Sequence, residues 1–139
     1  MTKVLLSLHV LAAIVAVGPV TVAASMFPAA LRRADHSAMR TLHRICRVYT
    51  AIGIAVPVLG LATAASLGVL GSAWLLTSIF LTIAAAVVLG FAVLPAQAEA
   101  LGTAGVSARR LGMTAGIFNL LWAVVVVLMV VRPGSTTGA

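Results

Sequence analysis

Residues 5–20, LLSLHVLAAIVAVGPV, decide the fold class of this chain, because almost every side chain in the stretch is apolar and none is charged. Apolar residues also continue beyond Val20. A helix needs about 20 such residues to cross about 30 Å of hydrocarbon. The stretch therefore predicts a membrane-spanning helix. It also contains His9, a polar side chain of a kind that is rare within membrane spans and marks functional sites when it occurs there.

The composition of the whole chain agrees with this interpretation. Of its 139 residues 63% are hydrophobic and 8% are charged, and the mean hydropathy is +1.22. Soluble domains carry about 25% charged residues, so this chain has too few to cover a surface in water. We therefore predict a single integral membrane domain over residues 1–139, with no separate soluble domain.

Four apolar segments are long enough to span a bilayer, and they predict an all-α, four-transmembrane-helix bundle. They cover residues 4–30, 45–67, 74–94 and 111–131. The first would be about 40 Å long as a straight helix, so we expect a bend at Gly18–Pro19; alternatively, its end SMFPAALRR lies along the membrane interface. The start of the chain also has the pattern of a signal peptide, but its apolar run exceeds the usual length, so we expect it to be retained. Residues 132–139 are expected to form a flexible tail.

The basic residues predict the orientation in the membrane. All of them except Lys3 and Arg132 fall in or beside the first and third loops. By the positive-inside rule both termini face outward and these two loops face the cytoplasm. The basic loop is expected to contact anionic lipid headgroups or a partner protein; its arginines are Arg32, Arg33, Arg40, Arg44 and Arg47. We do not expect nucleic-acid binding, because no basic stripe is interleaved with aromatic residues.

Small residues at four-residue spacing predict close packing between helices. Gly112 and Gly116 begin the last span in the motif GMTAG, and Gly60 and Ala64 form a similar pair in the second. The pattern is typical of a helix bundle. It leaves open whether the helices pack within one chain, in a homo-oligomer or against another membrane protein.

Several polar side chains are expected at a similar depth to His9, near the outer surface: Thr63, Ser66, Thr77 and Ser78. Together they would suit a proton or ligand site, or His9 would supply one axial ligand of a haem. Alternatively, the hydroxyls bond their own backbone, and His9 reaches headgroups or a neighbouring helix. Asn119 and Trp122 share a face of the last span, where Asn119 either bonds another helix or lines a ligand cavity.

The remaining candidates point away from several classes of function. His43 and Cys46 share a helix face, but zinc needs three or four protein ligands, so we expect no metal site. A single cysteine also excludes iron–sulfur clusters and intrachain disulfides. No nucleophile–base pair or phosphate-binding loop is present, so we expect no catalysis by side chains alone. No acidic residue lies within a span, which argues against proton-coupled drug export.

The segment LHVLAAIVAVGPV (residues 8–20), the four spans and the charge layout resemble an uncharacterised family of small bacterial integral membrane proteins, a domain of unknown function. Its members have a similar length, so the likeness covers nearly the whole chain. The first helix is more distantly similar to that of copper-resistance D-type and HemJ-type membrane proteins. In HemJ-type proteins a histidine of this helix is implicated in haem binding, and His9 is the matching position. Those relatives typically carry a tryptophan before the glycine, where this chain has Ala16 and Val17.

Three hypotheses of function follow. The first is an accessory, assembly or structural component of a bacterial inner membrane, without a cofactor, that packs as a homo-oligomer or within a larger membrane complex. The second is a redox module that binds haem b or a metal through His9. The third is a small transporter or channel.

Overall fold

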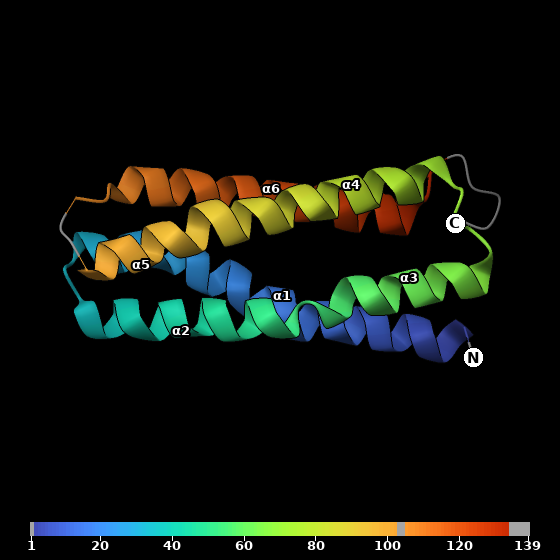
Figure 1. Ribbon diagram of the computed structural model, residues 1–139, viewed down its shortest axis with the longest axis horizontal. Helices are drawn as coiled ribbons and strands as arrows, with labels where there is room; N and C mark the ends of the chain where they lie inside the picture. The colour runs from blue at the N-terminus through green and yellow to red at the C-terminus, as the bar shows by residue number, and fades with distance from the viewer. Residues whose placement is uncertain (1, 103–104, 134–139) are drawn as a thin grey trace.

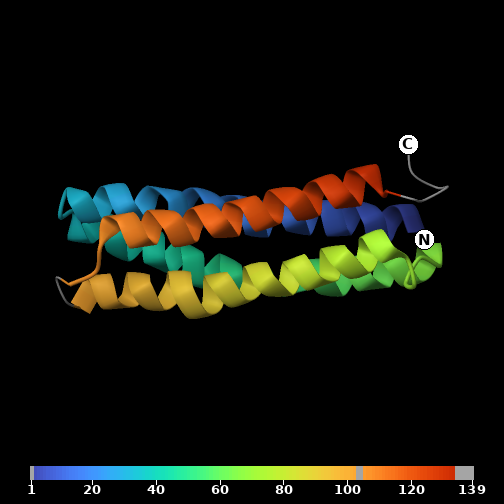
Figure 2. The same cartoon turned by 90° about the horizontal axis from the view of Figure 1, so that it is seen from above.

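The computed structural model describes residues 2–102 and 105–133, and these form a bundle of four long helical spans. The spans cover Thr2–Arg32, His36–Leu67, Ala73–Gly102 and Ala108–Val131, and each is long and apolar enough to cross a membrane. They run side by side along one axis in both views (Figures 1 and 2). The predicted all-α, four-helix membrane fold is therefore confirmed.

The first span is a single helix, α1 (Thr2–Arg32). It continues through Pro19 and Pro28, although each proline removes one backbone donor from the helix. Gly18–Pro19, where we expect a bend, lies within this uninterrupted helix. The segment SMFPAALRR does not lie apart along the interface, because its Phe27 and Ala30 are fully buried inside the bundle.

The second span consists of two helices, α2 (His36–Ile52) and α3 (Ala55–Leu67). It begins at His36 rather than at residue 45, because the Asp35 carboxylate caps the helix by accepting a hydrogen bond from the Ala38 backbone N–H at 3.1 Å. The two helices are separated at Gly53 and Ile54. Pro57 has no N–H to offer the Gly53 carbonyl, which instead accepts a hydrogen bond from the Val56 N–H at 3.1 Å.

The third span is also compound. It joins α4 (Ala73–Val88), the π-helix η1 (Leu89–Val93) and α5 (Leu94–Gly102). Helix α5 extends well past residue 94, so the segment PAQAEALG is helical rather than part of a long loop. The last span is α6 (Ala108–Val131). Of the predicted tail, residues 134–139 lie outside the described part of the chain.

The two ends of the bundle differ in packing. We call the end where α1 finishes and α2 begins the arginine end, and the end where α1 begins and α6 finishes the terminal end (Figure 1). The described residues form three buried hydrophobic clusters. Two of them occupy the middle and the arginine end, and both contain side chains from all four spans. The cluster at the terminal end contains only Ala64, Trp74 and Leu75 as buried members. There α3 packs on α1, while α4 packs on α6.

A candidate ligand cavity at the terminal end

A cavity of about 1060 Å³ lies between α1, α3, α4 and α6 at the terminal end. Ligand sites in proteins commonly measure about 300–1,000 Å³ and combine apolar walls with a few polar groups. This cavity fits that description, because most of its walls are aliphatic side chains. The side chains in its lining that carry a polar group are His9, Thr63, Trp74, Thr82, Trp122 and Arg132.

His9 joins α1 to α3 in the wall of the cavity. Its Nδ1 lies 2.9 Å from the backbone carbonyl oxygen of Val56. A carbonyl oxygen can only accept, so Nδ1 is the protonated nitrogen and donates. In the neutral ring this leaves Nε2 with its lone pair available to a ligand. The hydrogen bond therefore determines both the tautomer and the position of the ring.

Gly60 makes room for this ring. A Cβ atom at position 60 would lie 2.8 Å from Cε1 of His9 and 3.2 Å from Nδ1. The small residue therefore admits a side chain of α1, and its role is more specific than the general helix packing that the sequence indicates. Its partner in the predicted pair, Ala64, is buried in the cluster at the terminal end.

Gly112 and Gly116 have a different environment. A Cβ atom at position 112 would meet only Cγ of Pro28, at 3.9 Å, and one at position 116 would meet no atom within 4 Å. Within the described residues, the GMTAG motif thus mediates no contact that requires glycine.

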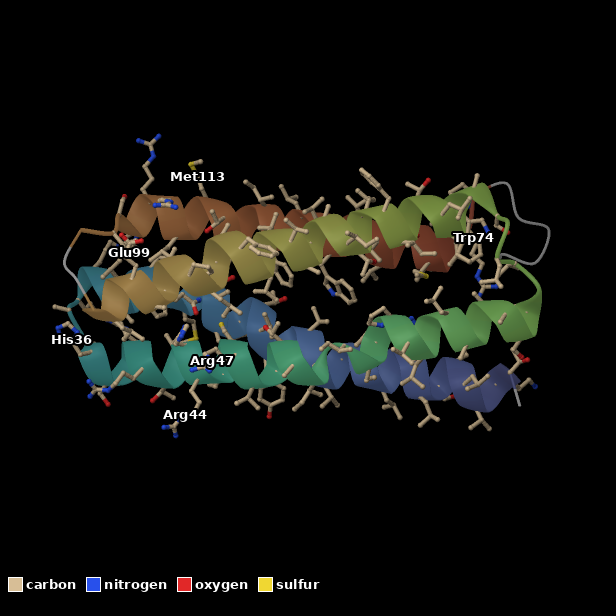
Figure 3. All side chains as sticks on the ribbon, viewed as in Figure 1. His36, Arg44, Arg47, Trp74, Glu99 and Met113 are labelled. Carbon is tan, nitrogen blue, oxygen red and sulfur yellow. The ribbon has the colours of Figure 1, made fainter. Side chains whose placement is uncertain are left out.

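Trp74 and Arg132 lie together at the terminal end of the cavity. The guanidinium carbon of Arg132 is 5.6 Å from the centroid of the Trp74 ring, a cation–π distance. Trp74 is 7% exposed, and its Nε1 is buried with no hydrogen-bond partner among the described residues. Figure 3 labels Trp74 near the start of α4. A buried N–H and a cation thus line the same cavity, and sequence reasoning singled out neither as a site residue.

The predicted outer polar cluster is only partly assembled. Thr63, Thr77 and Ser78 each donate to the carbonyl oxygen four residues earlier in their own helix, at 2.8, 2.9 and 2.8 Å. Ser66 is exposed and shares a hydrogen bond with Thr2. Of these four hydroxyls only that of Thr63 belongs to a residue lining the cavity.

Of the two residues of α6 that the sequence indicates as a candidate site, only one lines the cavity. Trp122 lines the cavity, whereas Asn119 is not among the lining residues. Asn119 instead donates through Nδ2 to the Ser25 hydroxyl at 2.9 Å, which connects α6 to α1. Its Oδ1 is buried without a hydrogen-bond partner among the described residues.

At the arginine end, hydrogen bonds connect a second set of polar side chains, which includes His43 and Cys46. Nδ1 of His43 donates to Oε1 of Gln97 at 3.0 Å, and Nε2 of Gln97 donates to Sγ of Cys46 at 3.6 Å. Both Gln97 and Cys46 are completely buried. Sequence reasoning missed Gln97 because it falls in the segment interpreted as a loop. Over residues 2–102 and 105–133, no group of three or more His, Cys, Asp or Glu side chains could hold a metal ion.

Comparison with family models, with curated proteins and with solved structures finds no match for this chain.

Proposed function

We propose that the protein is a small membrane haem-binding module that holds haem b in the cavity at the terminal end, with His9 as an axial ligand. The observation that carries the proposal is the hydrogen bond from His9 Nδ1 to the Val56 carbonyl, in the wall of a cavity of about 1060 Å³. Histidines that bind metals almost always donate their other ring N–H to a carbonyl, a carboxylate or water.

The other polar groups of the cavity suit the same ligand. A haem b has a broad apolar ring system and two propionate carboxylates at one edge. Aliphatic side chains and Trp122 provide walls for the ring system. The Arg132 guanidinium and the unpaired Nε1 of Trp74 provide a cation and a donor for a carboxylate. One occupant therefore accounts for His9, Trp74 and Arg132, whereas an uncharged lipid chain would account for none of them.

The chemistry of such a site would come from the haem, whose iron gains and loses one electron reversibly. The chain would bind the group, orient it through His9 and surround its ring system with apolar side chains. This role is compatible with membership of a larger membrane complex. We favour it over a purely structural role because His9, Trp74 and Arg132 line one cavity. We also favour it over transport, because Asn119 bonds to Ser25 and does not line the cavity.

The test is a haem titration of the purified protein, followed by the visible absorption spectrum. We expect a Soret band with the wild-type chain. In His9→Ala the affinity should fall by about tenfold or more, because the iron loses its protein ligand. Added imidazole should restore the band in this variant, which distinguishes a lost ligand from a misfolded protein.

A matched pair of glycine variants sharpens the test. Gly60 and Gly18 both line the cavity, but only a Cβ at position 60 would collide with the His9 ring. We expect Gly60→Ala to weaken haem binding, because its Cβ displaces the His9 ring, and Gly18→Ala to bind like the wild type. The proposal is wrong if the wild-type protein shows no Soret band, or if His9→Ala binds haem equally well.

A further inference from the structure

A second hollow lies at the arginine end, at the opposite end of the bundle from the cavity that contains His9. It is a groove of about 540 Å³ beside α2 and α5. Four of its six lining residues are basic side chains of α2, and the other two are apolar: Arg40, His43, Arg44, Arg47, Val48 and Leu101. We call it the arginine groove.

The helical repeat explains why these side chains gather. Arg40, Arg44 and Arg47 follow one another at intervals of four and three residues, which places them on one face of α2. They span about 10 Å along the helix axis. Figure 3 shows Arg44 and Arg47 on α2, with Arg44 directed away from the bundle. His43 is held on the inner side of this face by its hydrogen bond to Gln97.

Neither of the two acidic residues of the chain lines the groove. Asp35 caps the start of α2 through the Ala38 N–H. Glu99 is on α5, and Figure 3 shows it on the side of that helix away from Arg44. The three arginines thus line a groove whose walls contain no carboxylate, and such a concentration of positive charge attracts an anion.

The position of the groove relative to the membrane indicates which kind of anion it would bind. Helix α2 belongs to a span, and beyond Arg47 it presents Val48 and Ile52, which are 48% and 47% exposed and suited to contact lipid chains. Arg47 therefore lies where the polar part of the span gives way to its apolar part. An arginine at such a level extends its guanidinium toward headgroups rather than into hydrocarbon. Phosphate is its preferred partner there, because the planar guanidinium donates two parallel hydrogen bonds.

We propose that the arginine groove binds one anionic phospholipid, with the headgroup phosphate on Arg40, Arg44 and Arg47 and an acyl chain along Val48 and Ile52. Along α2 the arginines are followed by exposed apolar side chains, just as the charged headgroup of a phospholipid is followed by its acyl chains. This site does not depend on the haem proposal, because the two sites lie at opposite ends of the bundle.

The test measures how much phosphatidylglycerol the full-length protein retains, by native mass spectrometry from nanodiscs that contain phosphatidylglycerol and phosphatidylcholine. We expect one tightly held phosphatidylglycerol molecule. In the double variant Arg44→Gln/Arg47→Gln its affinity should fall by about tenfold or more. The control is Arg109→Gln/Arg110→Gln, which removes the same charge near the same end of the bundle but outside the groove, and should change the affinity less than about twofold.

Two results would overturn the proposal. Equal losses in the two double variants would show that the lipid responds only to overall charge. Displacement of phosphatidylglycerol by millimolar inorganic phosphate would show a site for a free anion rather than a lipid. Arg44→Lys/Arg47→Lys keeps the charge but loses the paired hydrogen bonds of each guanidinium, so we expect its affinity to lie between those of the wild type and the Gln variant. An affinity as low as that of the Gln variant would show that charge in the groove contributes nothing to lipid binding.

Discussion

The arginine end of this bundle carries most of the charged residues and the terminal end is almost entirely apolar, and the two ends are packed in different ways. At the arginine end the largest fully buried side chains, among them Phe27, Met39, Gln97 and Leu111, interlock across all four spans. At the terminal end the helices form two pairs around a cavity of about 1060 Å³. One end is thus closely packed, whereas the other contains the cavity in which we propose that a ligand binds.

The local cause of the difference lies in the middle of the second span. The interruption at Gly53 and Ile54, next to Pro57, lets α3 take a different direction from α2. Helix α3 then lies against α1, and the His9–Val56 hydrogen bond joins the two (Figure 1). Ala64 of α3 contacts Trp74 and Leu75 of α4 in one small buried cluster, and the cavity lies beside it.

The largest effect on stability is expected for a leucine at the arginine end, and a leucine at the terminal end provides the comparison. Leu111 is 1% exposed at the arginine end, and Leu75 is 3% exposed in the wall of the cavity. Leu111→Ala should lower the free energy of unfolding by about 2–5 kcal/mol, because it opens a void in a closed core. Leu75→Ala should cost less, because it only enlarges a space that exists already. Unfolding in mixed micelles measures both, and equal losses would contradict the comparison.

Gln97 should have an intermediate effect. Gln97→Leu leaves Nδ1 of His43 without its acceptor and removes the contact to Cys46, so we expect a loss of about 1–3 kcal/mol in the free energy of unfolding. When Gln97→Leu is introduced into the His43→Ala variant, the further loss in the free energy of unfolding should be smaller, because the His43 donor is already absent. A double-mutant cycle measures the coupling, and strictly additive losses would show that the His43–Gln97 bond contributes nothing.

The smallest effect is expected for the bond between α1 and α6. Hydrogen bonds between membrane helices contribute about 0.6 kcal/mol on average, so Ser25→Ala should lower the free energy of unfolding by about that amount. It should leave haem binding unchanged, because neither Ser25 nor Asn119 lines the cavity. Weaker haem binding in this variant would mean that the cavity depends on the contact between α1 and α6.

Much of the fold could be predicted from the sequence, but much less of the candidate site. Each apolar segment reveals its span by length alone. The boundaries were less accurate, because α2 continues through the polar residues beside Arg40 and α5 continues past Pro95. His9 is visible as an odd residue within a span. Nothing local to Gly60 indicates that it accommodates a side chain 51 positions earlier in the chain.

The sequence by itself determined that the chain is an all-α membrane protein with four spans, and that most of its positive charge lies beside two of its loops. These properties are local, because the hydrocarbon core requires a certain length of apolar residues wherever they occur in the chain. Only the tertiary structure decided that His9 meets Val56 and Gly60, that Gln97 joins His43 to Cys46, and that Trp74 and Arg132 line one cavity. Those contacts depend on how the helices pair and where they are interrupted. Between apolar helices in lipid, that pairing follows from shape and a few polar groups rather than from hydropathy.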